Sequence, residues 1–246
     1  MDKKDILSRV DHTLLSQTAT WEEIRQILDD GIKYGCASAC IPACYVKQAA
    51  EYADGKLPIC TVIGFPNGYH TTATKIFETR DAVANGADEI DIVLNVGKML
   101  EGHYDEVANE VEVIRTEMSP EVVLKVIIES GALKTPDLIR KASLLPMFAG
   151  ADFVKTSTGK IDVSATPEAA VVMCQAIRDY YRKTGRKVGF KPAGGVRSAE
   201  DAALYYTIVE EILGKEWLTP ELFRIGASSA ANNLLTAIEG REVKFF

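Results

Sequence analysis

The sequence predicts an α/β fold, a single barrel of parallel strands enclosed by helices. The first observation is that short apolar runs alternate with helix-length segments about eight times along the 246 residues. Second, helices of this length between strands imply parallel pairing through right-handed crossovers. Third, no Pro/Gly/Ser-rich linker or change in composition divides the chain. These observations predict one TIM (β/α)8 barrel domain over residues 1–246, with an open doubly wound sheet as the alternative.

The first half of the chain contains four strand and helix pairs. Thr20 can cap the first amphipathic helix, which places Ile24, Ile27 and Leu28 on one face. Pro42 ends the second strand, because proline cannot donate to a strand ladder. We expect strands at 9–15, 37–43, 58–66 and 89–97, and helices at 21–33, 45–52, 74–85 and 104–118.

The second half of the chain repeats the same alternation. We expect strands at 122–130, at 152–157, at 188–195 and at 223–228, with helices at 136–150, 167–183, 199–213 and 230–239. Barrel enzymes place their chemistry at the carboxyl ends of the strands. Thr13, Lys155, Lys191 and Gly226 fall at such ends, whereas Asp91 lies nearer the middle of its strand.

Composition excludes several classes of protein. The net charge of −7 argues against a nucleic-acid-binding protein, whose contact surface would be basic. The first eleven residues are charged and do not form a signal peptide. No apolar run approaches the roughly 18 residues that span a bilayer. The five cysteines are an odd number, which favours a reducing cytoplasm.

Neither a metal nor a cofactor is expected. Cys36, Cys40 and Cys44 occur every four residues, and Pro42 interrupts any helix that could bring them together. The three histidines form no paired zinc motif. Neither a P-loop nor a dinucleotide-binding glycine motif is present. Of these three cysteines, Cys40, beside a strand end, is the candidate for lining a pocket.

Two lysines follow short apolar strands and precede glycine loops: Lys155 in DFVKTSTGK and Lys191 in VGFKPAGG. A lysine with its ordinary pKa near 10.4 is almost never neutral at pH 7, yet attack on a carbonyl needs the neutral amine. A second ammonium about 4 Å away opposes the cation by about 4 kcal/mol at an effective dielectric near 20. We therefore expect Lys155 to be a nucleophile and Lys191 to lower its pKa. The alternative is two structural lysines paired with carboxylates such as Asp152 or Asp91.

Asp91 lies within the otherwise apolar strand EIDIVLN and shares a face with Glu89. An inward-facing aspartate near two lysines could transfer protons, but a buried ion pair is the alternative. Lys125 lies in the middle of another strand with no glycine loop after it. We expect Lys125 to be structural and to be a partner for Asp91.

Glycine-containing loops at residues 157–160, 193–198 and 225–229 follow the last three strands. Backbone amides in such loops bind phosphate, and barrels often hold phosphate near their last two strands. Lys160 and Arg197 could add positive charge there, and Ser228 and Ser229 could add hydroxyl donors. Plain turns are the alternative interpretation.

These motifs, together with DHTLL near the start and EIDIVLNVG in the middle, closely resemble those of deoxyribose-phosphate aldolases. The resemblance covers essentially the whole chain in order. It implies a class I Schiff-base aldolase on a TIM barrel with no metal. Such an enzyme reversibly cleaves 2-deoxy-D-ribose 5-phosphate to acetaldehyde and D-glyceraldehyde 3-phosphate. Some members carry a polar tail ending in tyrosine that aids proton transfer, whereas this chain ends in VKFF.

The resemblance also implies roles for individual residues. Lys155 is similar to the imine-forming lysine, Lys191 to the lysine that perturbs it, and Asp91 to the aspartate that relays protons. The implied contacts to the phosphosugar substrate are Thr13, Leu15, Cys40, Thr158, Gly159, Lys160, Gly194, Gly195, Gly226, Ser228 and Ser229. The alternatives are another phosphosugar enzyme on the same barrel and a non-catalytic phosphosugar sensor. No nucleic-acid or membrane partner is expected, and a homo-oligomer is possible.

Overall fold

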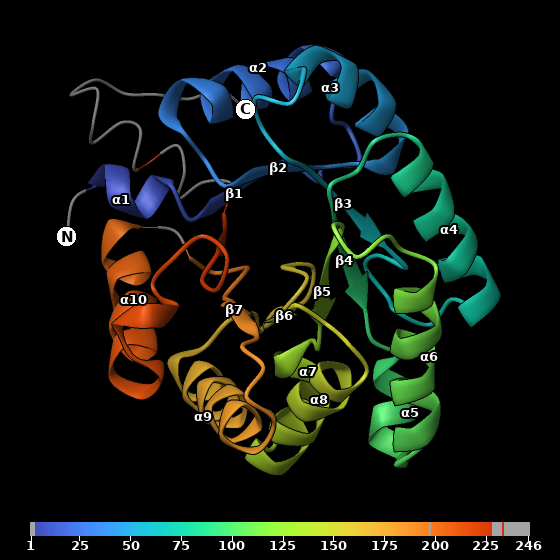
Figure 1. Cartoon of the computed structure of the whole chain (residues 1–246), viewed down its shortest axis with the longest axis vertical. Coiled ribbons are helices and arrows are strands. Elements are labelled where there is room, and N and C mark those ends of the chain that lie inside the picture. Colours follow the sequence, from blue (N-terminus) through green and yellow to red (C-terminus); the bar gives the residue numbers. More distant parts are fainter. Residues whose placement is uncertain (1–2, 197, 228–232, 234–246) are drawn as a thin grey trace.

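The computed structural model of the chain is a barrel of strands inside a ring of helices, and it describes residues 3–196, 198–227 and 233 (Figure 1). Each strand is short and buried. The strands are β1 (Val10–Thr13), β2 (Ser38–Ile41), β3 (Ile59–Ile63), β4 (Glu89–Val93), β5 (Val123–Ile127), β6 (Phe153–Lys155), β7 (Gly189–Lys191) and β8 (Ile225–Ala227).

The strands form one parallel sheet in the order β7-β6-β5-β4-β3-β2-β1-β8. Backbone hydrogen bonds close the remaining gap between β7 and β8. The Phe190 N–H donates to the Leu222 carbonyl at 2.9 Å, and the Gly226 N–H donates to the Pro192 carbonyl at 2.9 Å. This closure confirms the predicted TIM barrel and excludes the open doubly wound sheet.

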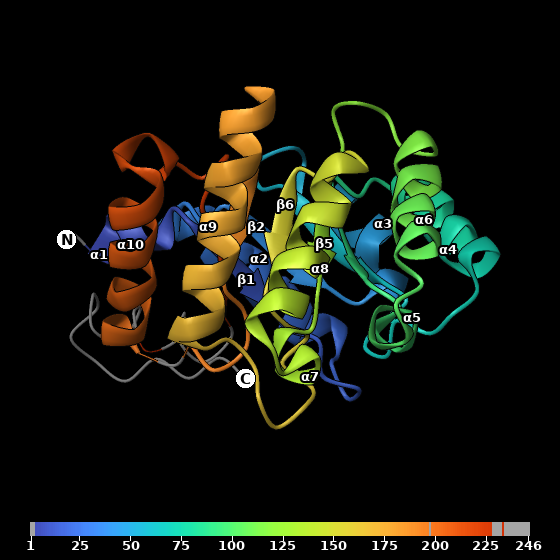
Figure 2. The same cartoon turned by 90° about the horizontal axis from the view of Figure 1, so that it is seen from below.

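Helices pack along the outside of the strands, as Figure 2 shows from the side. None of the described helices combines the length and apolar character needed to cross a membrane. The helices are α1 (Lys3–Leu7), α2 (Trp21–Tyr34), α3 (Val46–Ala53), α4 (Thr72–Ala84), α5 (Val96–Glu101), α6 (Tyr104–Thr116), α7 (Ser130–Leu133), α8 (Pro136–Phe148), α9 (Pro167–Thr184) and α10 (Ala199–Leu213), with 3-10 turns η1 (Ala43–Tyr45) and η2 (Lys215–Trp217).

Local signals explain most helix starts. Thr20 caps α2 as predicted, and Glu23 completes a reciprocal capping box with it. The expected strand at 89–97 was too long, because the Asn95 side chain accepts a bond from the Lys98 N–H and starts α5. The short helices α1, α5 and α7 were not predicted. The helix expected at 230–239 lies outside the described residues, apart from the isolated position 233.

The two sides of each strand differ in chemistry. On β4, Ile90 and Ile92 are fully buried in the apolar cluster between barrel and helices. The alternate positions of the strands point into the barrel because side chains alternate with a period of two. TIM barrel interiors are usually filled by bulky branched apolar residues. In this barrel many of the buried strand positions are instead charged: Asp11, Glu89, Asp91, Lys125, Lys155 and Lys191.

Candidate active site at the carboxyl end of the barrel

Lys155 and Lys191 lie side by side as the last residues of β6 and β7. The Lys155 Nζ donates to Asp91 Oδ2 at 2.7 Å, and the Lys191 Nζ donates to the same oxygen at 2.8 Å. Lys191 is fully buried, whereas Lys155 is 4% exposed and lines a cavity at this end of the barrel. The sequence prediction that these three residues form one cluster is therefore consistent with the geometry.

Asp91 is the carboxylate shared by three lysines. Its Oδ1 accepts from the Lys125 Nζ at 2.9 Å, so Lys125 is the structural partner that its mid-strand position predicted. Burial raises the pKa of Asp91, but the ammonium groups of Lys125, Lys155 and Lys191 lower it more, so it lies well below its ordinary range. Asp91 is thus ionised at neutral pH and is held between cations.

Lys191 has a second carboxylate partner that the sequence did not reveal. Its Nζ lies 2.5 Å from Asp11 Oδ2, and Asp11 comes from the middle of β1. Burial lowers the pKa of Lys191, but Asp11 and Asp91 raise it more, so its net pKa lies above its ordinary value. Lys191 is an ion-paired neighbour of Lys155 rather than an isolated ammonium. Its influence on Lys155 therefore depends on the charges around both.

Arg224 and Glu89 form an ion pair deeper in the barrel. Arg224 donates to Asp11 Oδ1 at 2.5 Å and to Glu89 Oε1 at 2.8 Å. The Lys125 Nζ lies 2.6 Å from Glu89 Oε2. We call the connected set the ion network. Among the described residues it consists of four cations, Lys125, Lys155, Lys191 and Arg224, and three carboxylates, Asp11, Glu89 and Asp91.

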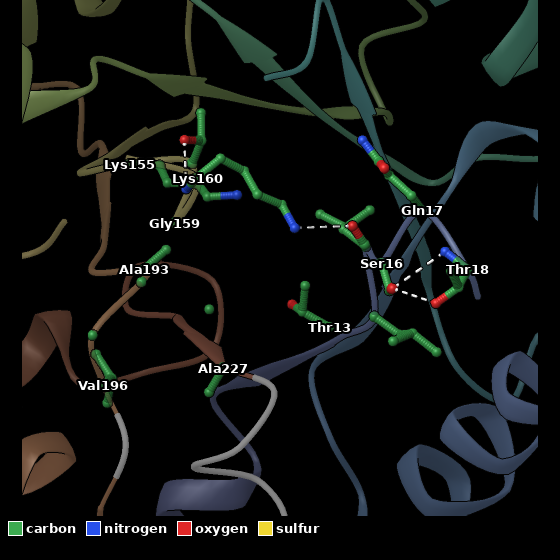
Figure 3. Close-up of a pocket in the computed structure, with 16 residues that line it drawn as sticks. Thr13, Ser16, Gln17, Thr18, Lys155, Gly159, Lys160, Ala193, Val196 and Ala227 are labelled. Carbon is green, nitrogen blue, oxygen red and sulfur yellow. Dashed lines mark hydrogen bonds between the residues drawn. The ribbon is translucent and has the colours of Figure 1, made fainter. Parts of the chain in front are cut away.

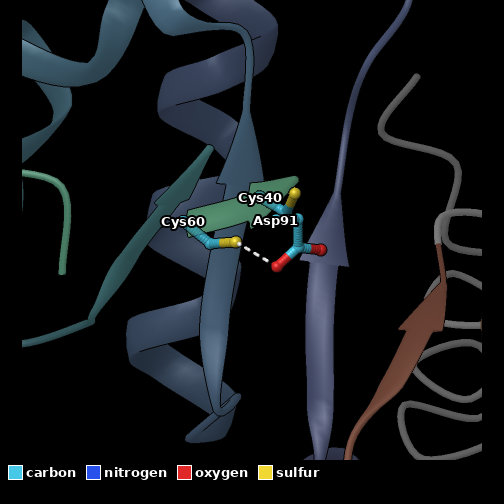
Figure 4. A group of neighbouring side chains, drawn as sticks. All are labelled: Cys40, Cys60 and Asp91. Carbon is cyan, nitrogen blue, oxygen red and sulfur yellow. Dashed lines mark hydrogen bonds between the residues drawn. The ribbon is translucent and has the colours of Figure 1, made fainter. Parts of the chain in front are cut away.

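Cys40, Cys60 and Asp91 lie close enough together to resemble a metal site (Figure 4). The Cys60 thiol donates to Asp91 Oδ1 at 3.3 Å, and burial raises the pKa of Cys60 well above its ordinary value. A metal would bind a thiolate and a free carboxylate, but burial disfavours the Cys60 thiolate and Asp91 already accepts from three lysine ammonium groups. The cluster is therefore better explained as part of the buried polar interior than as a metal centre.

The cavity above Lys155 has a volume of about 630 Å³ (Figure 3). Cys40 is absent from its lining, because this side chain is fully buried beside Cys60. Ser228 and Ser229 lie outside the described residues. Predicted contacts that do line the cavity are Thr13, Leu15, Thr158, Gly159, Lys160, Gly194, Gly195 and Gly226, joined by Leu14, Ser16, Gln17, Thr18, Ala193, Val196 and Ala227, which were not predicted.

Hydrogen bonds from hydroxyl side chains connect the glycine loop after β6 to the glycine loop after β7. The Ser157 Oγ donates to the Ala193 carbonyl at 2.6 Å, and the Ala193 N–H donates to Thr156 Oγ1 at 2.9 Å. Gly194 has a φ of 73°, and a Cβ there would come within 2.8 Å of the Gly159 Cα. The close contact of the two loops therefore requires glycine at position 194.

Lys160 crosses the opening of the cavity. Its Nζ donates to the Leu15 carbonyl at 3.1 Å, which joins the loop after β6 to the loop after β1 (Figure 3). The ammonium group thus already lies at the edge of the space above Lys155.

Gly226 was expected at the carboxyl end of its strand, but it is the middle residue of β8. A Cβ at this position would come within 3.2 Å of the Lys191 Cε.

Glu129 is a further charged residue of this end that the sequence did not single out. It follows β5 in a left-handed conformation with a φ of 52°, which is unusual for glutamate. Its carboxylate accepts from the Thr158 N–H at 3.3 Å and from the Thr158 hydroxyl at 2.5 Å. Burial raises the pKa of Glu129. Glu129 thus binds Thr158 at the start of the loop after β6, and the next two residues of that loop, Gly159 and Lys160, line the cavity.

Comparison with known proteins identifies the family. Residues 6–216 match the model of the DeoC/LacD family aldolases. A deoxyribose-phosphate aldolase of Streptococcus pyogenes serotype M5 (strain Manfredo) is 50% identical over 214 residues, which are 87% of this chain and 92% of that protein. The chain belongs to the DeoC/LacD aldolase family. It is therefore an aldolase, a carbon–carbon lyase, as the sequence motifs predicted.

Solved structures of aldolases share the fold of this DeoC/LacD family member. An aldolase named QR15 aligns with a TM-score of 0.82 at 30% identity, over 96% of each chain. The deoxyribose phosphate aldolase of Aeropyrum pernix aligns with a TM-score of 0.78 at 28% identity, over 96% of this chain and 92% of that one. The barrel and its helices are thus those of aldolases of known structure.

Proposed function

We propose that this aldolase reversibly cleaves 2-deoxy-D-ribose 5-phosphate to acetaldehyde and D-glyceraldehyde 3-phosphate through a Schiff base on Lys155. The observation that carries the proposal is the position of Lys155. Its amine lies between the ion network below and a cavity bordered by glycine loops above. The curated relatives are named for the same phosphosugar substrate.

The reaction begins when the neutral Lys155 amine adds to the aldehyde carbon of the open-chain sugar and water leaves. The resulting protonated imine accepts electrons as the C2–C3 bond breaks, while the C3 hydroxyl loses its proton. Glyceraldehyde 3-phosphate departs and leaves an enamine on Lys155. Protonation of the enamine carbon and hydrolysis of the imine then release acetaldehyde and restore the amine.

Asp91 and Lys191 are the groups proposed to move these protons. Lys155 and Lys191 contact the same Asp91 oxygen, which makes a continuous path between the two nitrogens. Asp91 binds its protons weakly because its pKa is lowered by three lysines. It therefore suits the transient transfer of a proton between stronger bases rather than storage of one.

The glycine loops are proposed to bind the substrate phosphate. Gly159, Gly194 and Gly195 bring backbone amides to one side of the cavity. Lys160 would turn from the Leu15 carbonyl to the phosphate, since a charge-assisted bond to an anion is stronger than one to a neutral carbonyl. A phosphate held there keeps the sugar aldehyde near Lys155, and such alignment contributes several kcal/mol to catalysis.

We further propose that no cofactor takes part, that the small-molecule partner is the phosphosugar substrate, and that the chain forms a homo-oligomer in the cytoplasm. The A. pernix relative is described as tetrameric. Five free cysteines are compatible with a reducing compartment. Light scattering of the purified protein tests the oligomer directly.

Borohydride trapping with acetaldehyde tests the covalent step. We expect mass spectrometry to find one reduced two-carbon adduct on Lys155 and none after Lys155→Met. Lys125→Met is the matched control, because Lys125 is buried and does not line the cavity, so any adduct should still map to Lys155 if that variant folds. An adduct elsewhere in the parent protein, or turnover without free acetaldehyde, would contradict the proposal.

A further inference from the structure

The deepest part of the ion network has no contact with the cavity. Glu89 opens β4 and Arg224 immediately precedes β8, so both lie towards the amino-terminal ends of their strands. Glu89 is 2% exposed and Arg224 is 7% exposed. The guanidinium also lies over the Phe153 ring, 5.7 Å from its centroid. Neither residue lines the site, yet each is joined to Lys155 by a chain of ion pairs. Arg224 connects through Asp11, Lys191 and Asp91, and Glu89 connects through Lys125 and Asp91.

The charges of the ion network are not balanced when all of its members are ionised. Lys125, Lys191 and Arg224 alone balance the three carboxylates, so the proton of Lys155 makes the described network positive by one charge. Net ion pairing overcomes burial and raises the pKa of Arg224, Lys125 and Lys191, which all stay charged. Lys155 is the cation of the network that lines the cavity, so it is the member that can lose a proton to water or substrate.

We propose that Arg224 and Glu89 are positioning residues that fix the charge of the ion network and thereby determine how readily Lys155 becomes a neutral amine. The proposal rests on the Schiff-base function proposed above. A negative charge removed from the network makes the proton on Lys155 less favourable, and a positive charge removed makes it more favourable. The activity of the amine is thus controlled from the end of the barrel opposite the cavity.

Other charged or titratable groups also surround Lys155. Asp91 on β4 contacts Lys155, and Lys191 on β7 contacts the same Asp91 carboxylate. Cys40 on β2 and Glu129 after β5 lie close enough for the charge of Lys155 to act on their pKa values. Cys60 borders Asp91, and Lys160 lines the same cavity. None of them is substituted when only Arg224 or Glu89 is changed. Differences between such variants therefore report the network charge alone.

The test compares the pH dependence of kcat/KM for the parent, Glu89→Gln, Arg224→Met and the double variant. The acid limb is the fall of kcat/KM at low pH. We expect its midpoint to shift down by about one pH unit in Glu89→Gln and up by about one unit in Arg224→Met. This is the effect of one charge about 10 Å from the amine at an effective dielectric near 20. The double variant restores the original charge count, so its limb should return to the parent position. Limbs that stay in place, or that move the same way in both single variants, would overturn the proposal.

Folding and chemistry are separated by two further measurements. Each single variant leaves every remaining network charge with a partner, since Arg224 keeps Asp11 and Glu89 keeps Lys125. Arg224→Lys keeps the charge and should keep the parent limb even if stability falls. In the unaltered protein, NMR of 15N-labelled lysine side chains should find Lys125 and Lys191 charged at the pH where Lys155 is neutral, and a neutral Lys191 would refute the charge count. Failure of borohydride trapping in the parent would instead refute the Schiff-base function itself.

Discussion

The inner and outer sides of the same barrel strands show how this fold divides its tasks. On β4, Ile90 and Ile92 face the helices and are fully buried among apolar side chains, whereas Glu89 and Asp91 face the barrel axis and bind cations. On β5, Leu124 belongs to the same apolar cluster, while Lys125 joins the ion network. The period of two in a strand makes this separation possible within a few residues.

The two sides depend on different physics. Each buried apolar side chain of the outer layer contributes about 1.5–3 kcal/mol, because it leaves water. The inner layer contributes less to stability, since burying charges costs desolvation that ion pairing only repays when the geometry is good. The comparison teaches that stability is supplied mainly between barrel and helices, which leaves the barrel interior free to hold the buried charges of the ion network.

The largest expected effect on function comes from Lys155→Met on the inner side. We expect kcat/KM to fall by about 10⁵-fold or more, because Lys155 is the nucleophile of the proposed mechanism. The free energy of unfolding should change little, since Asp91 keeps Lys125 and Lys191 as partners. Steady-state assays and urea unfolding of the same preparation check both parts. Substantial residual turnover would break the assignment of the reaction to the inner side.

Ile92→Ala is the matching change on the outer side of β4. We expect the free energy of unfolding to fall by about 2–5 kcal/mol, because Ile92 is fully buried in the apolar cluster. The kcat/KM of the folded fraction should stay within about twofold of the parent value, since charge and cavity are untouched. Urea denaturation and assays well below the midpoint measure the two quantities. A large loss of activity in fully folded protein would show that the two sides are coupled.

Glu129→Ala tests a charge at the rim that lies outside the ion network. Loss of its contacts with Thr158 should loosen the loop that carries Gly159 and Lys160. We expect KM for the phosphorylated sugar to rise by about tenfold, the equivalent of one lost hydrogen bond to a charged group. Unphosphorylated deoxyribose should be affected much less. Thr158→Val is the control that keeps the Glu129 carboxylate but removes the two hydrogen bonds of the Thr158 hydroxyl, to Glu129 and from the Lys160 N–H. Equal effects on both sugars would assign Glu129 to the chemistry instead.

The smallest effect is expected at Asp30, a charged residue on the outer side. Burial raises the pKa of Asp30 to about 6, so the folded protein holds its proton more tightly than the unfolded chain. This contribution to stability is present below the unfolded pKa near 3.8 and is lost as pH rises through about 6. Asp30→Asn should therefore raise the free energy of unfolding at pH 7 by about 1 kcal/mol and give no gain at pH 3. Thermal unfolding at the two pH values measures the difference, and an equal gain at both would reject the electrostatic cause.

Much of the fold and some of the site could be predicted because the signals are local. The alternation of apolar runs with amphipathic segments predicted the barrel, and lysines at strand ends before glycine loops indicated Lys155 and Lys191. The partnership of Asp91 with Lys125 followed from their positions in the middle of strands. The family resemblance of the motifs agreed with the family match.

The remaining features depend on contacts between distant parts of the chain. Asp11 and Arg224 are separated by 213 residues and meet only because β1 pairs with β8 when the barrel closes. Cys40 was expected in the cavity, but the register of β2 with β3 buries it opposite Cys60. Glu129 gave no signal because its role depends on where the loop after β6 passes.

The sequence by itself determined the order of the strands and of the longer helices, the aldolase family and the strand-end lysine proposed to react, since each depends on neighbouring residues. Only the tertiary structure decided which carboxylates balance which cations. Pairing energies fall with distance in space rather than in sequence, and barrel closure sets those distances.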